Sequence, residues 1–311
     1  RENAARDKSA REYELIDTGI FDDERYFDVF VEYAKASPTD ICVRMTVVNR
    51  GPDPAPIQLL PTVWFRNTWT WTDSAEKGVL SARNGLDRDG LRITKGSQCN
   101  YYLFFEGAPE PLFCENETNG QALFNVANAS SFTKDGIGRY IVNGEPGAVN
   151  PHMTGSKASL RYQYNIPPGG TETIYLRLTN SDVPTTGDLA KTCKAVFDKR
   201  IDEADEFYAG VIPANLSEDG RRIMRQSLAG LMWSKQYYHY EVRQWLEGDP
   251  AFPPPPQERL NGRNHNWKHV SAEDVISMPD KWEYPWYAAW DLAFHCIPIA
   301  LIDPVYAKRQ L

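Results

Sequence analysis

The 311-residue sequence has no run of 18 apolar residues, and this absence excludes a transmembrane helix. The nearest approach to such a run, Trp286 to Ile302, is interrupted by Asp291, His295 and Pro298. Positive charge is also scarce, because 34 Lys and Arg residues stand against 42 Asp and Glu residues. Nucleic acids and anionic membranes bind clustered basic residues, so we expect neither as a partner.

Cysteine is scarce as well, and no two cysteines have the Cys-x-x-Cys spacing. The five are Cys42, Cys99, Cys114, Cys193 and Cys296. An odd and scattered set indicates reduced thiols rather than a disulfide framework, so we expect a cytoplasmic protein. The chain begins at Arg1 in a polar segment and ends at Leu311 in a helical pattern. We therefore expect an excised fragment whose native N-terminus is missing, which leaves a signal peptide possible.

The sequence also lacks the usual patterns that hold phosphates or metal ions. It has no glycine-rich phosphate loop. His265 and His269 have the spacing that metal ligands use on a helix, but no acidic residue lies between them and the surrounding loop is rich in Pro and Asn. We expect neither a metal site nor a cofactor.

Residues 1–184 are predicted to form an antiparallel β-sandwich. Polar and apolar residues alternate from Ala158 to Ile166, and the alternation resumes from Ile174 to Leu178. The turn residues Pro167–Gly170 lie between these two runs, a pattern that predicts a hairpin. Further strands are predicted at 26–33, 41–48, 57–65, 101–105 and 139–142. Many short strands without a helical period are typical of an antiparallel sandwich.

The pattern becomes helical near residue 185, which predicts a second domain. An apolar stripe from Leu189 to Phe207 predicts a linker helix within 185–216. Ser217 is expected to cap the next helix, which would run for about 30 residues. Residues 248–285 are predicted to be irregular. A third helix is expected to begin near Trp286, to run past Leu301 and to bend at Pro298.

The densest candidate for chemistry is the segment 279–291, where three carboxylates lie among five aromatic residues. Sugars stack their flat C–H faces on Trp and Tyr, and their hydroxyls need polar partners. A carboxyl packed against indole rings loses solvation, which raises its pKa and keeps it protonated, as a general acid requires. Asp291 follows Trp290 and is the best-placed carboxyl. The alternative is that Asp291 only caps or braces a helix.

A second candidate is the aromatic run 64–71, which contains Arg66 and Asn67. These residues would line a pocket at a strand end, although the run is equally consistent with a core strand that has an exposed aromatic edge. The polar loop Glu115–Asn119 has the same two interpretations.

Residues Ser277–His295 resemble the bacterial glucosidase-like members of glycoside hydrolase family 63. The segments Trp64–Trp69, Glu115–Asn119 and Leu231–Tyr240 are similar to the same group. The resemblance covers essentially the whole chain, and Ser277–His295 is its most specific part.

This resemblance implies an N-terminal β-sandwich followed by an (α/α)6 barrel, of which 217–311 would be the beginning. It also implies hydrolysis of α-glycosidic bonds with inversion, with Asp291 as the general acid and a general base Glu beyond Leu311. The chain alone would then be inactive. Substrate-binding candidates are Trp286, Tyr287, Trp290, Lys281, Glu283, Arg66 and Asn67.

The expected partner is therefore an oligosaccharide or a small glycoside, and three kinds of substrate stay open: glucosides, mannosides and glyceryl glycosides. Two other functions also stay open. One is a non-catalytic carbohydrate-binding or scaffold protein, and the other is a different (α/α)6 enzyme such as a phosphorylase or lyase. A barrel Glu downstream would favour a hydrolase, whereas dependence on phosphate would favour a phosphorylase.

Overall fold

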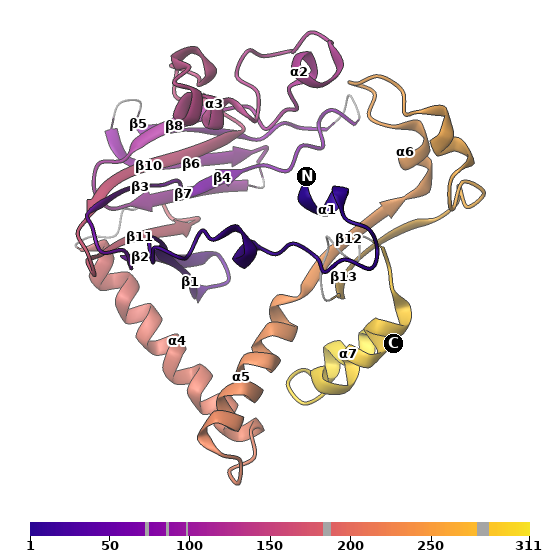
Figure 1. The fold of residues 1–311 in the computed structure, drawn as a ribbon. Helices are drawn as coiled ribbons and strands as arrows, with labels where there is room; N and C mark the ends of the chain where they lie inside the picture. The colour runs from indigo at the N-terminus through magenta and orange to yellow at the C-terminus, as the bar shows by residue number, and fades with distance from the viewer. Residues whose placement is uncertain (72–74, 85–86, 98, 183–187, 279–285) are drawn as a thin grey trace. The chain divides into compact units, whose positions relative to one another are not determined.

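The computed structural model describes residues 1–71, 75–84, 87–97, 99–182, 188–278 and 286–311 (Figure 1). The chain divides into two compact units, Arg1–Asp198 and Lys199–Leu311. Antiparallel sheets dominate the first unit and helices the second, which confirms the predicted change from β to α. Within the described ranges, no helix combines the length and the apolar character needed to cross a membrane.

The first unit contains two antiparallel sheets. Seven strands form one sheet in the order β1-β2-β11-β7-β6-β5-β9, and β10 pairs with β3, β4 and β8 in the other. The first sheet comprises β1 (Phe27–Ser37), β2 (Asp40–Asn49), β5 (Val79–Asn84), β6 (Asp87–Lys95), β7 (Cys99–Phe105), β9 (Thr154–Gly155) and β11 (Thr171–Thr179). The second comprises β3 (Ala55–Leu59), β4 (Thr62–Trp64), β8 (Glu110–Cys114) and β10 (Lys157–Ile166).

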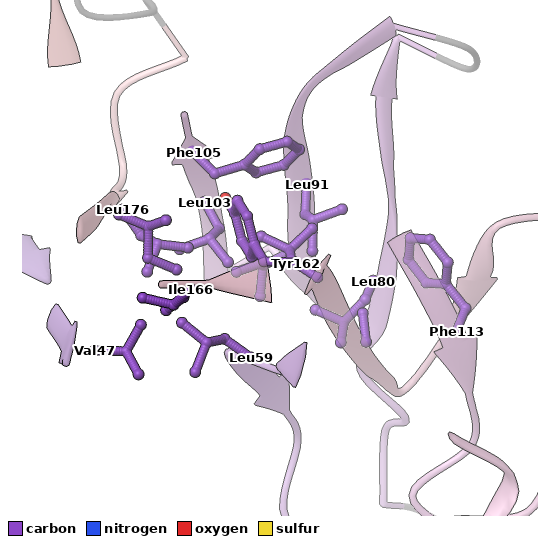
Figure 2. Close-up of a cluster of buried hydrophobic side chains, with 14 residues drawn as sticks. Val47, Leu59, Leu80, Leu91, Leu103, Phe105, Phe113, Tyr162, Ile166 and Leu176 are labelled. Carbon is purple, nitrogen blue, oxygen red and sulfur yellow. The ribbon is translucent and has the colours of Figure 1, made fainter. Parts of the chain in front are cut away.

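Side chains from both sheets meet in one hydrophobic core (Figure 2). Val47, Leu80 and Leu176 come from the seven-stranded sheet, and Phe113 and Ile166 come from the other. Each is at most 3% exposed. Because full burial of such a side chain contributes about 1.5–3 kcal/mol, this core is the main stabilising element of the unit.

The predicted hairpin between 158–166 and 174–178 is wrong. Both segments are strands, but β10 pairs within the smaller sheet whereas β11 pairs with β2 and β7. Pro167–Gly170 therefore carries the chain from one sheet to the other. The buried Asn49 stabilises this corner. Its side-chain Nδ2 donates to Ile166 O at 2.8 Å, and its backbone carbonyl oxygen accepts from Gly169 N at 3.0 Å.

The strand predicted at 139–142 is also wrong, because these residues belong to helix α3 (Gly136–Asn143). Ile137, Tyr140 and Ile141 have helical spacing and pack on buried residues of β8. Gly144 follows in the left-handed conformation, with φ of 67°, and ends the helix. A segment of four residues is too short to separate a helical period from a strand period.

The remaining helices are α4 (Leu189–Val211), α5 (Glu218–Trp233), α7 (Ala289–Ile299) and α8 (Pro304–Gln310), with the short helices α1 (Glu2–Ala5), α2 (Gly120–Phe124) and α6 (Val242–Glu247). The predicted cap of α5 is confirmed, since Ser217 Oγ accepts from Gly220 N at 3.1 Å. The third helix begins at Ala289 rather than near Trp286, and Pro298 lies in its last turn.

The long helix predicted from Ser217 to Trp245 is wrong, because α5 ends at Trp233. The chain continues as β12 (Lys235–Glu241), which pairs with β13 (Ser271–Ser277) in a two-stranded antiparallel sheet. β12 is rich in tyrosine, which favours strands. Its partner lies about 35 residues away and interrupts the segment predicted to be irregular, so helical periodicity alone misses both strands.

Candidate functional site

The C-terminal unit contains an open groove of about 1410 Å³. Its aromatic lining is Tyr237, Tyr238, Tyr240, Trp245, Trp286 and Tyr287, and its polar lining includes Lys235, Gln236, His239, Glu258, Arg259, Arg263 and Asn264. Flat rings beside hydrogen-bonding groups suit a ligand that has both apolar faces and hydroxyls. The volume exceeds the ~300–1,000 Å³ typical of small-molecule sites, so more than one sugar ring would fit.

The β12–β13 sheet positions one side of this groove. Tyr238 lies opposite Asp274 in the register, and its ring is 6.1 Å from the ring of Tyr287. Tyr237 donates a hydrogen bond through its hydroxyl to Glu273 on the neighbouring strand. Burial raises the pKa of Tyr238, so its hydroxyl stays protonated and able to donate at neutral pH.

Trp245 and Arg259 form a fixed pair on the groove lining. The guanidinium of Arg259 lies 4.1 Å from the centre of the Trp245 ring, and its Nη1 donates to Trp245 O at 3.2 Å. The pair joins α6 to the 3₁₀ turn Gln257–Asn261. Arg259 thus presents a positive charge whose position is set by stacking as well as by hydrogen bonding.

Two of the predicted aromatic residues line the groove and one does not. Trp286 and Tyr287 are about half exposed and belong to the lining. Trp290 is 70% exposed and packs edge-on against Phe294, with ring centres 5.7 Å apart. Among the described residues, the lining includes neither Trp290 nor Asp291.

Asp291 is half-buried in the first turn of α7. The N-cap of this helix is Ala288, so Asp291 is not the capping residue. The next residue, Leu292, is buried and anchors the turn in the core of the C-terminal unit.

A partly buried hydrogen-bond chain connects the helix that carries Asp291 to β13, and β13 to α8. His295, one turn further along α7, has its Nδ1 3.1 Å from Oγ of the fully buried Ser277. The backbone amide of Ser277 donates to Gln310 Oε1 at 3.1 Å, which ties β13 to α8. No local sequence pattern predicts this contact, because Ser277 comes from β13, a strand that periodicity does not reveal.

Arg66 and Asn67 follow β4 in the N-terminal unit. The exposed guanidinium of Arg66 lies 5.3 Å from the centre of the Trp71 ring. Asn67 Oδ1 accepts from Thr70 N at 3.3 Å and so closes a local turn. Lys281 and Glu283, the two other predicted binding residues, lie outside the described residues.

The aromatic run and the Glu115–Asn119 loop, two segments that the sequence singled out, are joined by Lys77. Its Nζ lies 2.9 Å from Glu115 Oε2 and 2.8 Å from Glu117 Oε1. Trp69 Nε1 also donates to Glu117, at 2.9 Å. Burial alone would lower the pKa of Lys77, but hydrogen bonds to the two carboxylates outweigh it and raise the pKa. The two carboxylates are engaged by this lysine, and the cluster orders both loops.

The described residues contain no group of three or more His, Cys, Asp or Glu side chains able to hold a metal ion. The two histidines considered from the sequence have other contacts. His265 Nδ1 lies 2.7 Å from Gly262 O, and His269 stacks on Trp267 with ring centres 5.9 Å apart.

Comparison with known proteins finds a yeast relative of this chain. No family model matches the chain. The chain is 38% identical to YMR196W, an uncharacterized protein of Saccharomyces cerevisiae, in an alignment of 353 positions that covers the whole chain. The chain spans 32% of that protein's length, so the shared sequence includes both units but only about a third of the relative.

Proposed function

We propose that this chain carries the general acid of an inverting glycoside hydrolase similar to family 63, with Asp291 in that role. The substrates are α-glucosides or related oligosaccharides. The general base is a Glu outside these 311 residues, consistent with a chain that spans a third of its relative. The proposal unites the resemblance of Ser277–His295 with the site described above.

The observation that carries the proposal is the position of the groove next to the start of α7. Trp286 and Tyr287 line the groove, and Asp291 follows four residues later in the first turn of the helix. In the proposal, a sugar stacks on these rings while its glycosidic oxygen faces the Asp291 carboxyl. Bound sugar would exclude water from the half-buried carboxyl.

An inverting reaction uses two carboxyl groups, a general acid and a general base, about 6.5–9.5 Å apart. This separation leaves room for the attacking water. Asp291 protonates the departing oxygen while the base takes a proton from that water. Lys281 and Glu283 are proposed to bind sugar hydroxyls. Arg66 and Asn67 are candidates in the N-terminal unit, where Asn67 would act as a donor because its Oδ1 already accepts from Thr70.

The barrel is likewise part of the proposal. Trp290, Phe294 and Ile297 share one face of α7, and they are 70%, 62% and 70% exposed. An exposed apolar face of this kind is typical of a surface that packs against another element. Further helices of an (α/α)6 barrel would cover it, and burial of Trp290 would then bring its indole against the site.

Sugar release by the intact protein tests the role of Asp291. We expect wild type to cleave members of a panel of α-glucosides, α-mannosides and glycosylglycerates, and Asp291→Asn to lose at least about a hundredfold in kcat, as removal of a general acid does. Asp219→Asn is the matched control, because Asp219 is also a first-turn aspartate of a helix, α5. Equal activity of Asp291→Asn and wild type would remove Asp291 from the mechanism.

A non-catalytic carbohydrate-binding protein is the alternative, and one observation favours it: Asp291 is not among the described groove-lining residues. This alternative predicts saturable sugar binding by wild type and Asp291→Asn without release of product. Release that requires inorganic phosphate would instead favour a phosphorylase.

A further inference from the structure

Two cysteines from distant parts of the sequence meet in the N-terminal unit. Cys42 lies on β2 and Cys193 lies in the second turn of α4. Neither has any exposed surface, and both belong to one buried cluster with Ala34 and Phe197. The two thiols interact closely enough to shift each other's pKa, that of Cys42 downward and that of Cys193 upward.

The surroundings of the pair distinguish the two sulfur atoms. Cys193 Sγ donates to Leu176 O at 3.8 Å, which holds it against β11. Cys42 lies opposite Arg177 in the β2–β11 register, and Arg177 Nε donates to Asp40 Oδ1 at 2.9 Å. The hydrogen bond with Cys193 is the main cause that lowers the pKa of Cys42, and Arg177 adds a smaller effect in the same direction, whereas burial and Asp40 raise it. The same hydrogen bond and burial raise the pKa of Cys193, so Cys42 is the better nucleophile of the two.

The helix that covers this pair is held by few contacts. Of the 23 residues of α4, only Cys193 and Phe197 are buried. Leu189 and Val196 add partly buried contacts, and the guanidinium of Arg44 lies 4.5 Å from the centre of the Phe197 ring. Segments with so few buried apolar contacts open locally without global unfolding, and opening of α4 would expose both thiols at once.

We propose that Cys42 and Cys193 are a redox pair that a hydroperoxide converts to a disulfide. The Cys42 thiolate attacks the peroxide oxygen and becomes a sulfenic acid as the O–O bond breaks and an alcohol, or water from hydrogen peroxide, departs. Cys193 then attacks the sulfur of Cys42, and water leaves. Two electrons pass from the two thiols to one peroxide, and a dithiol reverses the reaction by thiol–disulfide exchange.

The disulfide would lock the N-terminal half of α4 to the sheet. The helix spans the boundary between the two compact units at Asp198 and Lys199, so the lock acts at the root of the segment that connects them. The two cysteines are about 150 residues apart in the sequence, and closing so long a loop strongly restricts the unfolded chain. This inference does not rest on the proposed glycosidase activity.

Mass spectrometry of the intact protein tests the pair. The native protein is treated with hydrogen peroxide, alkylated, and digested without reduction. We expect a peptide that links Cys42 to Cys193, absent from Cys42→Ser and Cys193→Ser and retained in Cys114→Ser. Cys114 is the matched control because it is equally buried, in a cluster whose described members include no other cysteine.

Hydrogen exchange supplies the second readout. Amide exchange of residues 189–198 is expected to slow at least about tenfold in the oxidised protein and to recover with dithiothreitol, because the linked helix no longer opens locally. Two results would overturn the proposal: complete oxidation of the partly exposed Cys99 without the linked peptide, or a linked peptide that forms only in denaturant. Unchanged exchange in a linked protein would refute the locking role.

Discussion

At the scale of single residues, Glu106 shows two opposing effects on one carboxyl. The side chain is partly buried, and burial raises its pKa above the usual 4.5. Its Oε1 accepts from Ala190 N at 3.0 Å, at the start of α4, and this bond acts in the opposite direction. Burial prevails, so the folded protein holds the proton of Glu106 more tightly than the unfolded chain does.

This balance predicts how Glu106 affects stability with pH. Because the pKa of Glu106 is higher in the folded protein than in the unfolded chain, protonation of this carboxyl stabilises the fold. The full contribution is present below the unfolded-state pKa, and it is lost as pH rises through the folded-state pKa. Glu106→Gln mimics the protonated form and keeps the acceptor for Ala190. Urea titrations should therefore show the variant gaining stability relative to wild type between pH 4 and pH 7.

Glu172→Gln is the control for this prediction, because it removes the same charge from an exposed position on β11. If Glu106→Gln instead lost stability relative to wild type over that pH interval, burial would not be what raises the pKa of Glu106.

Part of the candidate site could be predicted at this scale. Trp286 and Tyr287 stand in an unusually aromatic segment, so composition alone singles them out, and both line the groove. Tyr238 and Arg259 join them from β12 and from the turn after α6. Tyr238 and Arg259 reach the groove through strand pairing and chain reversal, which no local sequence pattern predicts.

At the scale of elements, Pro167–Gly170 shows why strands are easier to predict than their partners. Alternation identifies both β10 and β11, since each has one buried face. A turn between two such runs usually makes a hairpin, but here the chain crosses to the other sheet. The deciding contacts come from Asn49, more than a hundred residues earlier, and are invisible locally.

Two glycines test what the backbone requires at these elements. Gly169 has φ of +66° in the turn Pro167–Gly170, which joins the two sheets, whereas Gly138 lies inside α3. A Cβ added at either position would meet nothing within 4 Å. Gly169→Ala should cost about 1–2 kcal/mol of unfolding free energy because of left-handed strain. Gly138→Ala should add about 0.5–1 kcal/mol because alanine restricts the unfolded chain and favours a helix.

Urea-induced unfolding of the two variants measures both effects. Each is the control for the other, because the same methyl group is added in open space. Shifts of equal sign would contradict the opposite effects that backbone conformation predicts for the two sites.

At the scale of the whole molecule, composition and periodicity predict antiparallel sheets followed by helices, and the structure confirms that order. The sheet unit was easier to predict because its core faces give a clear alternation. The helical unit was harder. The aromatic residues of β12 have a spacing that also fits one face of a helix. Only the pairing of β12 with Ser271–Ser277 shows that they belong to a two-stranded sheet.

Two observations concern the protein as a whole: α7 has an exposed apolar face, and the chain matches a third of a longer relative. In the proposed enzyme, the groove and Asp291 supply the aromatic platform and the acid, and the base comes from the rest of the barrel. The proposed reaction therefore has a defined stereochemical outcome, since two separate carboxyls with water between them invert the anomeric centre.

The most direct test is proton NMR of the first sugar anomer that the intact protein releases from an α-glycoside, read before mutarotation. We expect the β-anomer from wild type and from Asp219→Asn, and no sugar release from Asp291→Asn. First appearance of the α-anomer would contradict this expectation, because retention requires a nucleophilic carboxylate and a covalent intermediate.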